Sequence, residues 1–96
     1  MKHTAAREDR AFMHSLVIKK SAKKELDRLT DQIFEKIDTA ILKLKEEPFP
    51  FPQSKKLKGE NKRRLHIGDY RVIYTVNEGR KTITIVKIRH RKEVYR

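Results

Sequence analysis

Gly68 and Asp69 divide two runs of alternating residues, and this pattern restricts the possible folds more than any other part of the chain. With the two-residue period of a β-strand, one face of the first run takes Arg63, Leu65 and Ile67 and the other takes Lys62, Arg64 and His66. Glycine tolerates positive φ and aspartate hydrogen-bonds its own backbone, so the pair predicts a tight turn. The chain then returns over residues 70–76. We therefore predict an antiparallel hairpin with one face that can be buried and one that is cationic.

Two more strands and two helices are predicted around this hairpin. Residues 15–19 and 82–89 read as strands, and apolar residues recur at helical spacing after Ser21 and again after Thr30. Either hydroxyl can cap a helix N-terminus. The order β-α-α-β-β-β predicts an α+β domain, in which a helix hairpin packs on one face of a mainly antiparallel four-stranded sheet.

Two local patterns add detail to this fold. Residues 48–52 alternate proline with phenylalanine and end the second helix, because proline lacks an amide donor. We interpret the segment as a loop that its aromatic rings hold against the core, and a proline-rich ligand for a partner is the alternative. In the last strand Ile83 and Ile85 alternate with Thr84, Val86 and Ile88, which is typical of a central strand buried on most of both faces.

The length of 96 residues allows one domain with a modest core. Residues 1–13 are mostly polar and predict a flexible N-terminal leader, so the domain is expected to span residues 14–96. The chain has no cysteine, which excludes disulfides and thiol catalysis. It has no apolar run typical of a signal peptide or a membrane span, so a cytoplasmic protein without membrane binding is expected. No histidine has companions at metal-ligand spacing, and we expect neither a metal nor another cofactor.

Positive charge is concentrated in the second half of the chain. Residues 1–54 hold 11 Lys and Arg against 9 Asp and Glu, whereas residues 55–96 hold 14 against 4. Such an asymmetry indicates a polyanionic partner, either a nucleic acid or an acidic protein, because a concentrated positive field attracts phosphates and carboxylates.

Three motifs in this basic half together resemble a known family. They are Lys56-Leu57-Lys58-Gly59, the run Arg64-Leu65-His66-Ile67-Gly68-Asp69-Tyr70-Arg71-Val72-Ile73-Tyr74, and the run His90-Arg91-Lys92-Glu93-Val94-Tyr95. At this spacing and chain length they are similar to the RelE branch of the RelE/ParE toxin superfamily, over residues 14–96. His66 stands where many relatives have arginine.

The resemblance implies a RelE-like microbial RNase fold and the toxin of a type II toxin–antitoxin system. Such a toxin is a metal-independent endoribonuclease that cleaves mRNA in the ribosomal A site and inhibits translation. Its implied partners are a cognate RelB-like antitoxin, the ribosome and mRNA, with operator DNA bound only through the antitoxin complex. The alternatives are a ParE-like inhibitor of DNA gyrase, or a catalytically weak toxin that acts mainly as an antitoxin-bound corepressor.

RNA can be cut without a metal when a base takes the 2′-hydroxyl proton, cations stabilise the phosphate and an acid protonates the leaving oxygen. Arg71 is the first candidate, because a guanidinium can clamp two phosphate oxygens and stays charged; by motif it matches the phosphate-stabilising arginine of RelE-like enzymes. Lys62 and Arg64 match the two basic positions before it, and Lys62 is a candidate base if neighbouring positive charges favour its neutral amine.

The C-terminal motif supplies further candidates. Arg89 and Arg91 compete for the role of the C-terminal arginine, and Tyr95 resembles the tyrosine that stacks on a base or assists proton transfer. His90 can serve as base or acid, or it only packs at the strand end, and both interpretations stay open. The remaining candidates for RNA or ribosome binding are Lys55, Lys56, Lys58, Arg63, Lys87 and Lys92. The alternative for the whole basic group is a solvated surface that only docks an acidic antitoxin or an rRNA backbone.

Overall fold

A computed structural model describes the chain from residue 13 to residue 94. Most of the expected leader and Tyr95 therefore lie outside the described residues. The helices and strands, in chain order, are β1 (Ser15–Ile18), α2 (Lys20–Asp27), α3 (Asp31–Lys43), β2 (Ser54–Lys56), β3 (Arg63–Ile67), β4 (Tyr70–Asn77), β5 (Thr82–His90) and α4 (Arg91–Val94).

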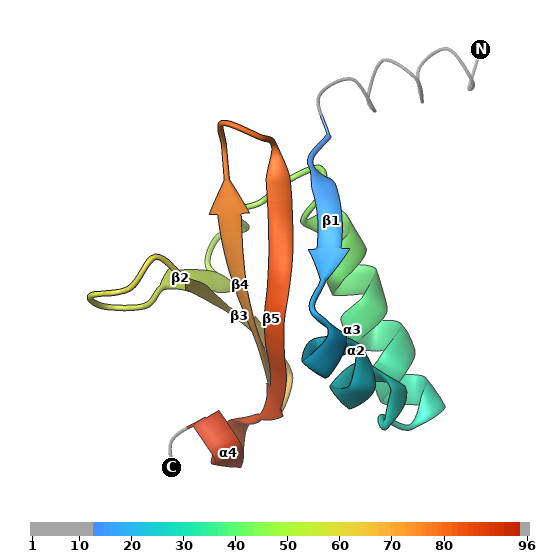
Figure 1. Ribbon diagram of the computed structural model, residues 1–96. Helices are drawn as coiled ribbons and strands as arrows, with labels where there is room; N and C mark the ends of the chain where they lie inside the picture. Colours follow the sequence, from blue (N-terminus) through green and yellow to red (C-terminus); the bar gives the residue numbers. More distant parts are fainter. Residues whose placement is uncertain (1–12, 95–96) are drawn as a thin grey trace, which may run out of the picture.

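The strands form one sheet in the order β1-β5-β4-β3-β2, with β1 parallel to β5 and all other pairs antiparallel. The predicted α+β fold is confirmed, but the sheet has five strands rather than four. The additional strand, β2, is three residues long, and its sequence Ser-Lys-Lys carries no apolar alternation that would have revealed it. Figure 1 shows α2 and α3 together on one side of the sheet, with α4 at the lower end beside the C-terminus.

The core lies between this sheet and the two helices. Ala22 and Leu26 of α2 and Ile37 and Ile41 of α3 are buried against it, as the helical spacing predicts. The predicted Ser21 cap is wrong, because α2 begins one residue before it. Thr30 is the N-cap of α3 as predicted, but its side chain makes no capping hydrogen bond. Packing rather than capping therefore holds these helices. Among the described residues, no helix is long and apolar enough to cross a membrane.

A register shift in β5 decides which of its side chains face the core. Ile85 pairs with Tyr74 and Lys87 pairs with Ile73, so Val86 is an extra residue in the ladder. The bulge changes the alternation, and Ile88 joins Ile83 and Ile85 on the helix side. The prediction of a strand buried on most of both faces is therefore wrong. With an unbroken two-residue period Lys87 would have faced the core; it faces away from the helices instead.

The loop before β2 is fixed to the sheet by a chain of hydrogen bonds. Arg63 Nε donates to Ser54 Oγ (2.7 Å), Ser54 Oγ lies 2.5 Å from the Tyr74 hydroxyl, and that hydroxyl donates to the Pro48 carbonyl (2.7 Å). Tyr74 is fully buried. Its burial raises the pKa of its phenol, and this shift is partly offset by the hydrogen bonds and charge of Ser54 and Arg63.

The two phenylalanines of this loop behave differently from the prediction. The Phe49 ring lies 5.0 Å from the Arg63 guanidinium and is 41% exposed, whereas Phe51 is 91% exposed. The interpretation that aromatic rings hold the loop to the core is therefore wrong for Phe51. A carbonyl bound to Tyr74 holds the loop instead.

Candidate functional site

The face of the sheet opposite α2 and α3, here called the open face, holds five of the predicted cations. Residues paired across neighbouring strands share a face, and their Cα atoms lie about 5 Å apart. One cross-strand row of the open face is Lys55, Arg64, Ile73 and Lys87, and the next row is His66, Arg71 and Arg89. Residues from four strands, more than thirty positions apart in the sequence, are thus brought together.

Arg71 occupies the centre of this face and is fixed in place. Only 7% of the residue is exposed, and its Nη1 donates to the carbonyls of Gly68 (2.9 Å) and Tyr70 (2.8 Å). Gly68 has φ +56°, as the predicted turn requires. Arg71 Nε and Nη2 form no hydrogen bond within the part of the chain that the structure describes. One edge of a rigid, permanently charged guanidinium is therefore available to an anion.

Arg89 forms an ion pair with Glu25 of α2, a residue for which the sequence predicted no role. Because β1 pairs with β5 only up to Ile85, the edge of β5 beyond that point lies next to α2 instead. Glu25 of α2 accepts the Ile88 amide through Oε1 (2.9 Å), and its Oε2 pairs with the Arg89 guanidinium. No sequence signal distinguishes Glu25 from the other charged residues of this lysine-rich helix.

The structure separates the two histidines of the basic half. His90 lies on the helix side in a T-shaped contact with Tyr70, with ring centroids 5.3 Å apart, and its Nδ1 accepts the Lys92 amide (3.3 Å). His66 is exposed on the open face and pairs directly with Arg71. The packing interpretation of His90 therefore agrees with the geometry, and His66 is the imidazole beside the fixed guanidinium.

Several other candidates lie away from Arg71. Lys62 precedes His66 by four residues, about 13 Å along the strand, and its Nζ lies 3.8 Å from Glu60. Arg63 is on the helix side with Ser54 and Phe49. Arg91 begins α4, where its amide donates to the Asp69 carbonyl (2.7 Å). The remaining predicted cations are exposed on β2, the loop after it and α4: Lys56, Lys58 and Lys92.

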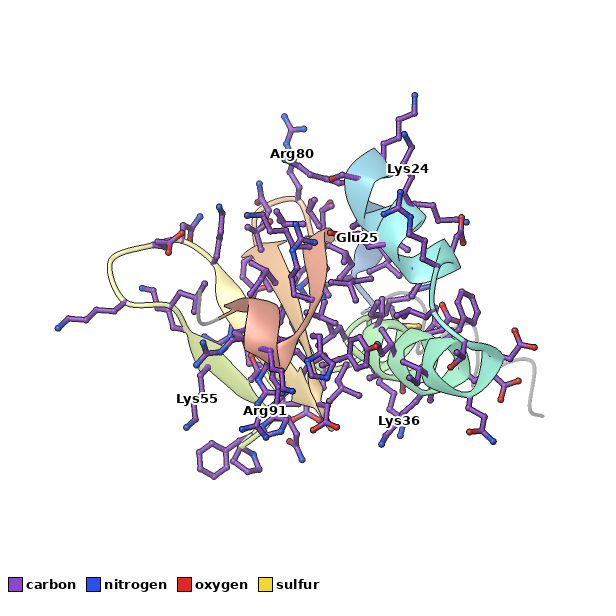
Figure 2. The ribbon with its side chains drawn as sticks, turned by 90° about the horizontal axis from the view of Figure 1, so that it is seen from below. Lys24, Glu25, Lys36, Lys55, Arg80 and Arg91 are labelled. Atoms are coloured by element: carbon purple, nitrogen blue, oxygen red, sulfur yellow. The ribbon has the colours of Figure 1, made fainter. Side chains whose placement is uncertain are left out.

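Figure 2 shows Lys55 and Arg91 toward one side of the molecule, while Lys24 and Arg80 lie toward the other. Lys24 and Arg80 are exposed and belong to α2 and the β4–β5 turn. No group of three His, Cys, Asp or Glu side chains that could hold a metal ion occurs among residues 13–94. Chemically, the open face offers five cations, of which Arg71 and Arg89 are held by polar contacts, and one imidazole among them.

Comparison with known proteins gives one family. A family model described as the ParE toxin of the type II toxin–antitoxin system, parDE, matches residues 16–95. No curated protein sequence matches the chain.

Solved structures with the same fold are toxins and toxin–antitoxin complexes. The RelE–RelB complex of the archaeon Pyrococcus horikoshii matches with 32% identity and a TM-score of 0.75, over 82% of this chain and 96% of that one. The RelB–RelE complex of Methanococcus jannaschii matches with 27% identity and a TM-score of 0.66, over 82% and 94%. The isolated RelE toxin of Escherichia coli shares the fold, with 22% identity and a TM-score of 0.71 over 85% and 90%.

Proposed function

Since this chain belongs to the ParE toxin family of type II toxin–antitoxin systems, within the RelE/ParE superfamily, we propose that it is a ribosome-dependent endoribonuclease that cleaves mRNA in the A site. The observation that carries the proposal is the fixed guanidinium of Arg71, with His66 beside it on one strand and Arg89 on the other. A toxin of this kind acts in the cytoplasm, where ribosomes are, and needs no metal.

The proposed reaction is cleavage by the neighbouring 2′-hydroxyl. The 2′-oxygen gives its proton to a base and attacks phosphorus, and the bond to the 5′-oxygen breaks. The leaving oxygen takes a proton from water or from an acidic side chain, which leaves a 2′,3′-cyclic phosphate and a 5′-hydroxyl. The free edge of Arg71 binds the phosphate oxygens, where negative charge grows in the transition state. Lys55, Arg64 and Lys87, one row along, bind the flanking phosphates.

His66 is our assignment for the group that takes the 2′-hydroxyl proton. It is exposed, it pairs with Arg71, and an imidazole nitrogen can accept a proton. His90 lies on the other side of the sheet and Lys62 lies two rows away, so neither lies beside Arg71 as His66 does. Tyr95, outside the described residues, stays a candidate for stacking on a base or for proton transfer.

The test is primer extension on one mRNA, first naked and then under translation in a cell-free extract. We expect codon-spaced cuts on the translated message alone, and Arg71→Ala should lower the cleavage rate by roughly 100-fold or more, as when one transition-state donor is lost. Arg80→Ala is the matched control, because it removes an exposed cation from the far end of the sheet. His66→Gln should lower the cleavage rate by about 100-fold or more, because it removes the proposed base.

A ParE-like inhibitor of DNA gyrase is the second candidate, favoured by the name of the family model that matches the chain. Such a protein binds gyrase without cutting RNA. If no message is cut with or without translation, the ribonuclease proposal is wrong and a gyrase supercoiling assay tests this candidate. If Arg71→Ala cuts as fast as the parent protein, the open face is not the active site.

For its partner we propose a cognate RelB-like antitoxin, through which alone the toxin contacts operator DNA. The similar structures from Pyrococcus horikoshii and Methanococcus jannaschii are RelE–RelB complexes. The net charge of +12 favours an acidic segment in that antitoxin.

A further inference from the structure

Phe51 is exposed to a degree that its role in the fold does not explain. It is 91% exposed, whereas the next exposed large apolar side chain among the described residues, Val17, reaches only 49%. The ring therefore contributes almost no burial to folding. It stands in water on a segment that is otherwise held in place.

The turn that carries Phe51 is anchored on both sides. The Pro48 carbonyl accepts the Tyr74 hydroxyl (2.7 Å), and the Pro50 carbonyl accepts the Ser54 amide (2.8 Å). A ring presented by a fixed backbone loses little conformational freedom when a ligand packs against it. Phe51 is thus a preorganised apolar surface.

The turn also lies beside the proposed active site. The Gln53 carbonyl accepts the His66 amide (2.9 Å), which continues the β2–β3 ladder one residue beyond Ser54 and Leu65. Gln53 therefore lies beside His66 at the edge of the sheet, in line with the cross-strand pair of His66 and Arg71. Phe51 is two residues, at most about 7 Å of chain, from Gln53.

The cations on the neighbouring row of the sheet select the kind of ligand. Lys55 and Arg64 pair with each other in the cross-strand row next to that of Gln53 and His66. An aromatic ring that emerges among cations is the arrangement by which proteins bind unpaired nucleic-acid strands, with bases on the ring and phosphates on the cations. We propose that Phe51 is a stacking platform for an unpaired RNA base next to the phosphate bound by Arg71, an inference that rests on the proposed ribonuclease function.

The chain has no tryptophan, so Phe51→Trp places a single indole at this position as a fluorescent probe. We would titrate this full-length variant at low salt with a single-stranded RNA oligonucleotide and with an abasic strand of the same length and charge. The RNA should quench the indole because a stacked base contacts it, and the abasic strand should bind without quenching.

Affinity of the other variants gives the second readout. Base–aromatic stacking predicts that Phe51→Ala and Phe51→Leu bind the RNA about 10- to 100-fold more weakly than the parent protein, with unchanged affinity for the abasic strand. Arg71→Ala should weaken binding to both strands, because it removes a phosphate contact. Val17→Ala, at an exposed apolar residue of β1, is the matched control and should bind like the parent.

Three results would overturn the inference. Equal RNA affinity of the parent and Phe51→Ala, with Arg71→Ala still impaired, removes the stacking platform and leaves the ribonuclease proposal standing. No binding of RNA by any variant removes the stacking platform, and cleavage of the translated message then decides the ribonuclease proposal separately. Unchanged RNA affinity with weakened binding of the antitoxin identifies the ring as a protein contact instead.

Discussion

Replacing Glu25 by alanine should destabilise the fold by about 2–3 kcal/mol, although Glu25 lies on a helix surface. Its Oε1 accepts the amide of Ile88, a residue that is only 4% exposed. Loss of the acceptor leaves a buried donor without a partner, which costs about 1–3 kcal/mol. The ion pair with Arg89 adds little, about 0–1 kcal/mol, because the two side chains are 23% and 34% exposed.

The measurement is urea or guanidinium unfolding, with the melting temperature as a second readout. For a domain of this size 1 kcal/mol corresponds to about 4–8 °C, so the expected fall is roughly 10–20 °C. Glu25→Gln separates the two contributions, because the amide oxygen still accepts from Ile88 while the charge is lost. We expect it to cost about 1 kcal/mol.

Arg89→Ala completes a double-mutant cycle. If the hydrogen bond from the Ile88 amide accounts for most of the effect, the coupling energy between Glu25 and Arg89 is below about 1 kcal/mol. Arg89→Ala is then nearly as stable as the parent. A coupling energy equal to the whole loss of stability in Glu25→Ala would refute this reasoning. A Glu25→Gln variant that is as unstable as Glu25→Ala would also refute it.

Two further predictions concern stability. Tyr74→Phe removes the hydroxyl between Ser54 Oγ and the Pro48 carbonyl and should cost about 1–3 kcal/mol in urea unfolding. Because burial raises the pKa of Tyr74 above its ordinary 10.0, the unfolded chain loses this proton first, so its contribution is full below pH 10.0 and is lost as pH rises through the raised pKa. Unfolding free energies measured up to strongly alkaline pH should therefore fall less in Tyr74→Phe than in the parent; an equal fall contradicts this assignment. Gly68→Ala should cost about 1–2 kcal/mol, because Gly68 has φ +56°, and Gly79→Ala, at a glycine without positive φ, should cost less; equal losses would show that the turn does not depend on φ.

The hairpin at Gly68 and Asp69 could be read from the sequence because its two signals, strict alternation and turn chemistry, are both local. The same alternation separated Arg64 and His66 from Leu65, and the structure keeps that separation. The bulge at Val86 could not be predicted this way. It depends on how β5 pairs with β4, and a strand's own sequence does not state its register.

Two other features depend on contacts between distant segments. Glu25 and Ile88 are 63 residues apart, and the sequence near either residue does not indicate the hydrogen bond between them. The exposure of Phe51 was missed for a related reason: phenylalanine beside proline predicts burial by residue type, whereas Tyr74 had already anchored the loop through a carbonyl. Residue type predicts average burial, but a hydrogen bond from elsewhere in the fold can make that burial unnecessary.

The bulge at Val86 links the fold to the proposed chemistry. Without it Lys87 and Arg89 would share the face of Ile85, and two cations would enter an apolar core without partners, which is costly. With it, Ile88 fills the core and both cations join Arg71 on the open face. No paired strand residue on that face is acidic, and the carboxylate that pairs with Arg89 comes from Glu25 of α2. The open face therefore carries a net positive charge, which attracts an anion. The RNA strand and the acidic antitoxin segment that we propose as ligands would both bind these cations, so we expect the antitoxin to lower the affinity of the toxin for RNA.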